Sequence, residues 1–168
     1  MQGMCEGGSK VVTDTRDLPD YREIFSGRLV GLLQWPQFER LWQWLADNPD
    51  GWYVRDFRTG GLPAAPMPAE EFRLFLKETE AFLRRRHREE YCGFLYADDA
   101  EAPVFIKVFD PRRMGSACGC GGAVVPRWTI SRMPPVPLEA EAGESGENGG
   151  RAGARASLLR RFFGARDR

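Results

Sequence analysis

The stretch from Pro68 to Arg88 constrains the fold of this chain most, because its apolar residues recur along one side only. Glu70 and Glu71 stand in the first turn of the helix that this spacing predicts, and arginines crowd its last turn over residues 84–88. Both placements suit the dipole of a helix, which favours anions at the start and cations at the end. A one-sided helix must pack against another layer of structure. The apolar stripe comprises Phe72, Phe75, Leu76, Thr79, Phe82 and Leu83.

A second one-sided stretch predicts a helix over residues 35–45. Pro36 suits the first helical turn, where a backbone N–H has no partner to lose. The sequence Asn-Pro-Asp-Gly over residues 48–51 then ends the helix and turns the chain. The apolar positions of this stretch have helical spacing, and they are Trp35, Phe38, Leu41, Trp42 and Leu45.

Four short runs rich in β-branched and aromatic residues predict strands, at residues 52–57, 91–96, 104–109 and 124–133. The link between the second and third runs is short and polar and ends in Pro103, which predicts a β-hairpin. The predicted element order is therefore roughly α-β-α-β-β-β. We expect an α+β fold in which two helices pack on one face of a small antiparallel sheet.

Composition divides the chain into three parts. Residues 1–20 have no sustained period and are expected to form a flexible N-terminal arm, whereas residues 21–136 hold the predicted elements of a single α+β domain. After residue 137 an acidic, glycine-rich stretch gives way, from residue 151 onward, to six arginines against one aspartate. Such a tract buries too little apolar surface to offset its ordering entropy, so residues 137–168 are expected to be a disordered acidic-then-basic tail.

The distribution of apolar residues predicts a cytoplasmic protein, and the overall charge is balanced. Lys and Arg together number 24, as do Asp and Glu, so the overall charge gives no clear indication of nucleic-acid binding. No apolar segment near the N-terminus marks a signal peptide. No stretch approaches the roughly 20 apolar residues that span a bilayer, so we expect no transmembrane segment. In the cytoplasm the four cysteines would stay reduced.

The most informative local motif is a pair of cysteines, Cys118 and Cys120, in the glycine-rich stretch 114–122. Two thiols separated by one small residue can contact the same metal ion or cluster, and glycines let the backbone approach closely. A zinc ion or an iron–sulfur cluster needs four ligands. Cys92 is a candidate third ligand, and the fourth is unidentified. The same cysteines could instead form a redox pair or simply be tolerated in a long loop.

The titratable residues supply no complete catalytic set. His87 is the only histidine, which excludes a metal site with two histidines. A thiol enzyme at Cys118 or Cys120 would lack an identifiable base. We therefore expect a protein without enzymatic activity.

Two features of the predicted domain favour a protein partner. Arg84, Arg85 and Arg86 form a cation cluster that could dock an acidic partner, although such a cluster also suits the end of a helix. Trp44 lies off the apolar stripe of the helix over residues 35–45. We expect it to be an exposed contact, since tryptophan is enriched where proteins bind one another.

The tail ends in a compact apolar and basic peptide over residues 156–164, in which Ser157 can cap a short helix. A segment this short is not a stable helix alone. It could fold into a groove of a partner, contact an anionic membrane weakly, or remain frayed. The residues predicted to contact a partner are Leu158, Leu159, Arg160, Arg161, Phe162 and Phe163.

Three segments carry a resemblance to other proteins: Tyr-Cys-Gly-Phe-Leu-Tyr-Ala-Asp-Asp at 91–99, Phe-Ile-Lys-Val-Phe-Asp-Pro at 105–111 and Gly-Ser-Ala-Cys-Gly at 115–119. This sequence resembles small uncharacterised proteobacterial accessory proteins that are associated with nitrogen-fixation and hydrogenase gene clusters. The resemblance covers roughly residues 35–135 and includes no recognised catalytic motif. It implies an accessory role around an oxygen-sensitive metalloenzyme and assigns no functional residue.

These observations lead to two hypotheses. The first is an accessory or regulatory protein without enzymatic activity that binds a protein partner, in support of a nitrogenase- or hydrogenase-type metalloenzyme. The alternative is a metal or iron–sulfur protein that uses Cys118 and Cys120, with Cys92, for cofactor delivery or electron transfer. The cofactor would then be zinc or an iron–sulfur cluster.

Overall fold

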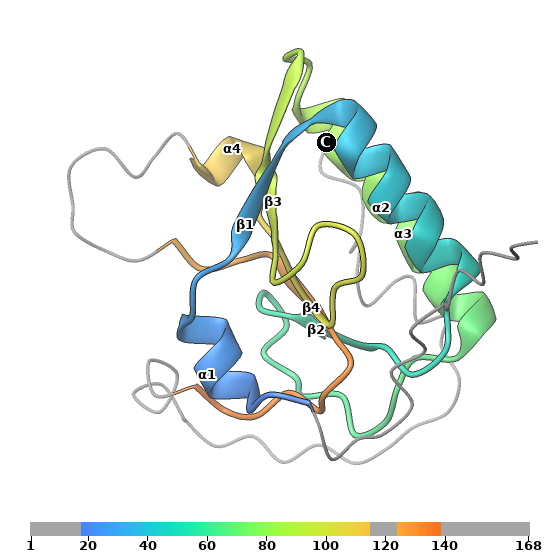
Figure 1. Cartoon of the computed structure of the whole chain (residues 1–168), viewed down its shortest axis with the longest axis vertical. Coiled ribbons are helices and arrows are strands. Elements are labelled where there is room, and N and C mark those ends of the chain that lie inside the picture. Colours follow the sequence, from blue (N-terminus) through green and yellow to red (C-terminus); the bar gives the residue numbers. More distant parts are fainter. Residues whose placement is uncertain (1–17, 115–123, 139–168) are drawn as a thin grey trace, which may run out of the picture.

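The computed structural model describes residues 18–114 and 124–138 (Figure 1). Most of the predicted N-terminal arm, and the predicted tail from residue 139 onward, lie outside these ranges. No helix within them is long and apolar enough to cross a membrane. The elements in chain order are α1 (Tyr21–Ser26), β1 (Val30–Gln34), α2 (Trp35–Asp47), β2 (Tyr53–Asp56), α3 (Ala69–Arg86), β3 (Tyr91–Ala97), β4 (Phe105–Val108), α4 (Pro111–Met114) and β5 (Trp128–Ser131).

The strands form one antiparallel sheet of five strands in the order β1-β3-β4-β5-β2. This confirms the α+β class, and β3 and β4 form the predicted hairpin. Apolar residues face one another across three neighbouring strands: Ile130 of β5 is paired with Ile106 of β4 on one side and with Val54 of β2 on the other. The sheet therefore joins β2, from the first half of the chain, to β5 near the end of the described residues.

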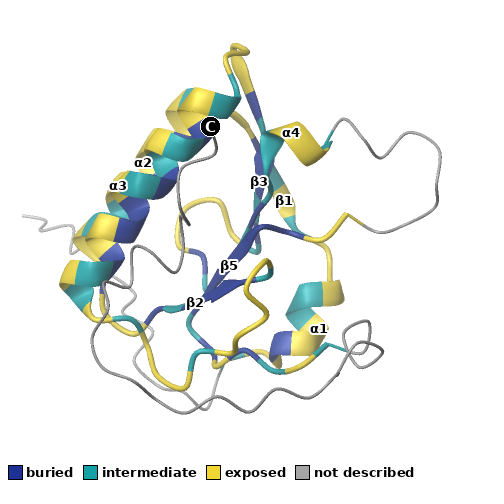
Figure 2. Cartoon of the chain, turned by 180° about the vertical axis from the view of Figure 1, so that it is seen from behind, coloured by how far each residue is buried: buried dark blue, intermediate teal, exposed yellow. Residues whose placement is uncertain are grey.

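Helices α2 and α3 pack on one face of this sheet, as predicted, and bury their apolar stripes against it (Figures 1 and 2). Trp42 of α2 donates its indole N–H to the backbone oxygen of Leu76 in α3, at 2.9 Å. Ring contacts continue this core, with Phe72 stacked on Trp52 and Phe75 set edge-on against Trp128. Aromatic residues thus supply much of the buried area that holds the two helices on the sheet.

The predicted element order needs three additions, which are α1, β1 and α4. Helix α1 is capped by the Asp20 carboxylate, which accepts from the N–H groups of Arg22 and Glu23. It lies on the face of the sheet away from α2 and α3, called here the back face (Figure 1). There Tyr21 packs edge-on against Phe105 and its hydroxyl is 2.8 Å from that of Thr129. The back face therefore has a second, smaller core under α1.

A register shift in the pairing of β1 with β3 decides which side chains of β3 enter the main core. Phe94 and Leu95 are adjacent in sequence and both pack in the main core, whereas strict alternation in a strand would point them to opposite faces. A β-bulge at this point reverses the alternation. As a result Cys92 and Phe94, before the shift, pack in the same core as Leu95 and Ala97 after it.

Candidate protein-binding surface

Among the described residues, helix α1 covers only part of the back face and leaves the surface over β1 and β3 open. Gly31 of β1 is paired with Tyr96 of β3, and a Cβ at Gly31 would lie 3.2 Å from the Tyr96 ring and 3.7 Å from the Leu33 side chain. These contacts place the side chains of Tyr96 and Leu33 on the same face as Gly31. The absent side chain at Gly31 thus lets the aromatic ring of Tyr96 lie across the strand pair.

A hollow of about 410 Å³ lies beside this ring. Its wall is mainly apolar and it carries one charged side chain, that of Lys107. A concave site with an apolar lining and one polar anchor is the usual form of a recognition site. The residues that line the hollow are Gly27, Leu29, Tyr96, Lys107, Phe109, Met114 and Val124.

Lys107 is held at the edge of the hollow by contacts with the end of α1. Its ammonium donates to the backbone oxygen of Phe25 at 2.6 Å and lies 3.9 Å from the centre of the Phe25 ring. Burial lowers the pKa of Lys107 below the ordinary value. An ammonium has three N–H donors. A carboxylate bound in the hollow could therefore accept from Lys107 and offset the cost of burying its charge.

The two edges of the sheet differ in how they are covered. Strand β2 has three buried residues, and Arg55 donates to the backbone oxygen of Val136 from the segment that passes beside it. Strand β1 forms the other edge, and within the described residues no strand lies beyond it. Val30 and Leu33 are 51% and 56% exposed. Exposed apolar edge strands readily pair with other chains, and proteins usually protect them.

The sequence prediction missed this surface. Its one signal was the apolar sequence Leu-Val-Gly-Leu-Leu over residues 29–33, which neither alternates cleanly nor has a helical period. The end of β1 is closed by Gln37, whose side-chain oxygen accepts from the N–H groups of Leu33 and Gln34 at 3.1 Å. Residues 30–32 are the part of this edge that is paired with no further strand among the described residues.

The predicted metal ligands are not brought together in the described residues. Cys118 and Cys120 lie outside these residues, but Met114 and Val124, which flank that segment, both line the hollow. No group of three metal-ligating side chains occurs within residues 18–114 and 124–138. Cys92 is fully buried in the main core, and burial raises its pKa to about 11. Metal ligation requires the thiolate, so these properties weigh against Cys92 as the third ligand.

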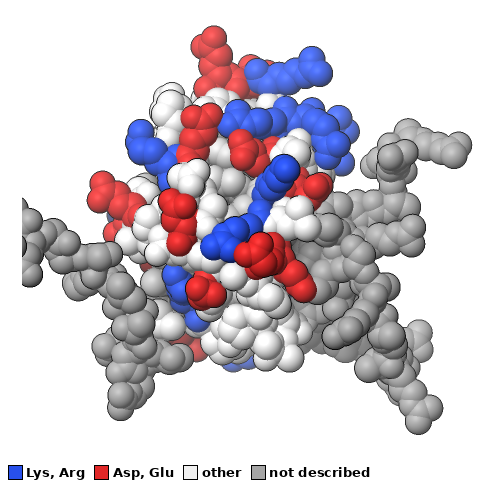
Figure 3. All heavy atoms as spheres, turned by 90° about the vertical axis from the view of Figure 1, so that its right-hand side faces the viewer, with Lys and Arg blue, Asp and Glu red and all other residues white. Residues whose placement is uncertain are grey.

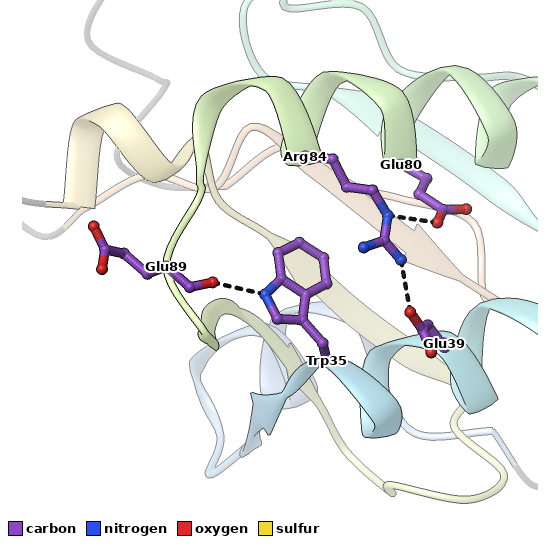
Figure 4. A network of polar contacts seen from close by, with 5 residues as sticks. All are labelled: Trp35, Glu39, Glu80, Arg84 and Glu89. Atoms are coloured by element: carbon purple, nitrogen blue, oxygen red, sulfur yellow. Dashed lines mark hydrogen bonds and ion pairs between the residues drawn. The ribbon is translucent and has the colours of Figure 1, made fainter.

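The three arginines of the predicted cluster differ in their contacts. Arg84 forms ion pairs with Glu80 at 2.8 Å and with Glu39 of α2 at 2.9 Å, and its guanidinium lies over the Trp35 ring (Figure 4). Trp35 in turn donates to the backbone oxygen of Glu89. Arg84 therefore ties α3 to α2, and it is less available to a partner than the sequence indicated.

The other two members of the cluster differ from each other. Arg86 pairs with Asp110 at 3.0 Å and its guanidinium lies 4.3 Å from the centre of the Phe82 ring. Arg85 is exposed and has no ion pair among the described residues. Over the side of the molecule that carries α2 and α3, basic and acidic side chains are interspersed among the described residues (Figure 3). This distribution does not favour an extended anionic ligand on that side.

Trp44 is half-buried, which corrects the expectation of an exposed contact. Its ring lies 6.3 Å from that of Trp52, nearly perpendicular to it, at the margin of the main core. The sequence could not show this, because Trp52 lies beyond the turn that ends α2, and the spacing of residues within the helix does not predict where the chain goes after that turn. The predicted partner-binding residues of the tail, from Leu158 to Phe163, lie outside the described residues.

Comparison of the chain with protein families, with curated proteins and with solved structures finds no match.

Proposed function

We propose that this chain is an accessory or regulatory protein without enzymatic activity, and that it binds a protein partner along β1 and the hollow beside Tyr96. The distribution of exposed apolar side chains carries this proposal. Among the described residues seven large apolar side chains are exposed. Five belong to β1, to the start of β3, or to the segment at the hollow, and these are Val30, Leu33, Tyr91, Val124 and Val125.

The partner that suits this surface is an extended apolar segment of another polypeptide. Such a segment can pair its backbone with residues 30–32 and place alternate side chains against Leu33 and Tyr96, as in β-strand addition. The charged group in the hollow, Lys107, adds a preference for a carboxylate on the bound segment. Backbone pairing would provide affinity, and the hollow with its lysine would provide selectivity.

The class of partner follows from the resemblance of residues 91–119. We extend the proposal to a nitrogenase- or hydrogenase-type metalloenzyme as the protein that this chain supports. The support for this extension is the sequence resemblance alone. The alternative of a metal or iron–sulfur protein rests on the sequence alone, on Cys118 and Cys120 with Cys92 as the candidate third ligand.

A selection from displayed random linear peptides tests the proposed binding surface while the partner is still unidentified. The immobilised full chain should enrich peptides with alternating apolar residues and one Asp or Glu. Leu33→Lys places a charge on the edge strand and should abolish that enrichment. Leu74→Lys is the matched control, because Leu74 is also exposed but lies on α3, so enrichment should persist. Lys107→Met should keep the apolar pattern and remove the acidic preference.

Two results would overturn the proposal. One is the absence of any enriched sequence with the folded wild-type chain. The other is enrichment that Leu33→Lys leaves unchanged, because binding would then occur elsewhere on the molecule. Circular dichroism and urea unfolding of each variant establish that loss of binding is not loss of folding, since a surface substitution is expected to change stability by less than about 0.5 kcal/mol.

A further inference from the structure

A second, smaller pocket lies between the end of β2 and the start of α3, away from the surface proposed above. Asp56 ends β2, and its backbone oxygen accepts from the N–H of Gly60 and the hydroxyl of Thr59. Gly60 has a φ of 68°, which only glycine adopts readily, so the chain turns back sharply at this point. The returning chain is fixed where Met67 donates to the backbone oxygen of Trp52 at 2.7 Å.

The walls of this pocket are apolar and stiff. The pocket has a volume of about 230 Å³, which is below the roughly 300–1,000 Å³ of usual small-molecule sites. Proline fixes the backbone φ, so a wall rich in proline loses little entropy when a ligand binds. A space of this size suits one long side chain or a small ligand of similar size. The apolar walls are formed by Leu62, Pro63, Ala65, Pro66, Met67 and Pro68.

Two carboxylates line this apolar pocket, and each has a buried oxygen that has no hydrogen-bond partner within residues 18–114 and 124–138. Asp56 is 3% exposed; its Oδ1 accepts from the Arg127 guanidinium and from the N–H of Arg58, but its Oδ2 accepts from no group in the described part of the chain. The Oε2 of Glu71, in the first turn of α3, is also unpartnered. Leaving a buried charged acceptor unsatisfied is costly, so such groups in native proteins call for an explanation.

The charges around the pocket indicate which chemical group a ligand would need. Arg127 forms an ion pair with Asp56, which offsets one of the two negative charges, whereas no ion pair of Glu71 occurs among the described residues. A ligand that donates hydrogen bonds and carries a positive charge would satisfy both free oxygens. A neutral donor would leave the negative charge of Glu71 without a counter-charge, and an anionic ligand would be repelled by it.

We propose that the Asp56–Glu71 pocket binds a guanidinium or primary ammonium group whose apolar stem lies against the proline-rich wall. The same chemistry occurs in an arginine or lysine side chain of a polypeptide and in a free alkylguanidine or amine. The pocket is independent of the β1 surface, so either site can fail without affecting the argument for the other.

Titration followed by amide chemical shifts of the isotope-labelled full chain tests this proposal. Three probes are compared: butylguanidinium, arginine blocked at both ends as a peptide mimic, and blocked citrulline as the neutral match to arginine. Butylguanidinium should shift the amides of residues 56–71, and blocked citrulline should not. If blocked arginine also binds, the site accepts a side chain of a polypeptide. If only butylguanidinium binds, the site is reserved for a free cation. Either result supports the cationic site.

Glu71→Gln removes one charge with little change in shape and should weaken binding of butylguanidinium by about tenfold or more, since hydrogen bonds to charged groups are the strong ones. Glu70→Gln is the matched control, because Glu70 is the preceding residue of the same helical turn but is 88% exposed and paired with Arg73. The Glu70→Gln variant should bind butylguanidinium with the affinity of the wild type. Binding of blocked citrulline at residues 56–71, no shift of these residues with butylguanidinium, or no effect of Glu71→Gln would each overturn the proposal.

Discussion

The guanidinium of Arg84 lies 4.6 Å from the centre of the Trp35 ring, and these two residues join the end of α3 to the start of α2. Glu80 fixes the same guanidinium from within α3, and Glu39 fixes it from α2. Together these groups raise the pKa of Arg84: burial acts to lower it, but the hydrogen bonds and charges of Glu80 and Glu39 outweigh that effect. The contact therefore serves the packing of the two helices.

Arg84→Ala should lower the free energy of unfolding by about 1–2 kcal/mol, the sum expected for one cation–π contact and two exposed ion pairs. Arg85→Ala is the control, because Arg85 has no ion pair among the described residues, and it should change stability by less than about 0.5 kcal/mol. Urea unfolding of both variants measures the difference. Equal stability of the two variants would show that Arg84 does not link the helices.

Gly31 tests the geometry of the open surface. A valine at this position would place its Cβ 3.2 Å from the Tyr96 ring, closer than ordinary van der Waals contact. We expect Gly31→Val to destabilise the protein by about 1–3 kcal/mol, as overpacking does. In a Tyr96→Ala background the same substitution should cost much less, because the ring that it meets is gone. A cost that stays the same in both backgrounds would contradict the placement of Tyr96 over Gly31.

The burial of Cys92 has two consequences that can be measured. It changes how stability depends on pH, and it protects the thiol from alkylation. Burial raises its pKa from 9.0 to about 11, so the folded state keeps the thiol proton over a range in which the unfolded state loses it. The contribution of Cys92 to stability is therefore fully present below pH 9 and is lost as the pH rises from 9 towards 11.

The measurement for Cys92 is alkylation of a variant in which the other cysteines, Cys5, Cys118 and Cys120, are serine. Iodoacetamide at about pH 8, where an ordinary thiol is partly ionised, should label the folded chain slowly and the urea-unfolded chain at the rate of a free thiol. Rapid labelling of the folded chain would show that Cys92 is accessible. It would then be available as a ligand after all.

The metal hypothesis has its own test, which does not depend on any partner. If Cys118 and Cys120 hold zinc or an iron–sulfur cluster, chain purified without oxygen should contain stoichiometric metal, and iron should give a visible absorption band. Cys120→Ser should then lose the metal, whereas Cys92→Ala should retain it, because Cys92 is buried in the core. A folded chain that contains no metal would contradict the hypothesis.

How far the sequence predicted the fold depends on the length of each pattern. Helices α2 and α3 run for several turns and present their apolar residues at helical spacing, so a local pattern was sufficient. Helix α1 has six residues, too few for a period to emerge. Strand β1 was missed because it is an edge strand that exposes Val30 and Leu33, and its pattern therefore lacks the alternation of a half-buried strand.

The candidate sites depended on contacts between residues far apart in sequence, which the sequence does not show. The sequence predicted that Arg84 is available to a partner. Its ion pair with Glu39 joins residues 45 positions apart, and a local pattern cannot show such a contact. The Asp56–Glu71 pocket has no motif, since it arises from where β2 ends and α3 begins and from which oxygens lack partners. The position of the hollow likewise required the order of strands β1, β3 and β4.

The most direct test of the proposed function is site-specific photo-crosslinking in cells of the organism that expresses the chain. A benzoylphenylalanine at Leu33 should give one discrete adduct with another polypeptide, whereas the same group at Leu74 on α3 should give none. Leu33 and Leu74 are both exposed, so they differ mainly in the surface that they occupy. An adduct with the mass of two copies of this chain, equal adducts at both positions, or none at Leu33 would contradict the account.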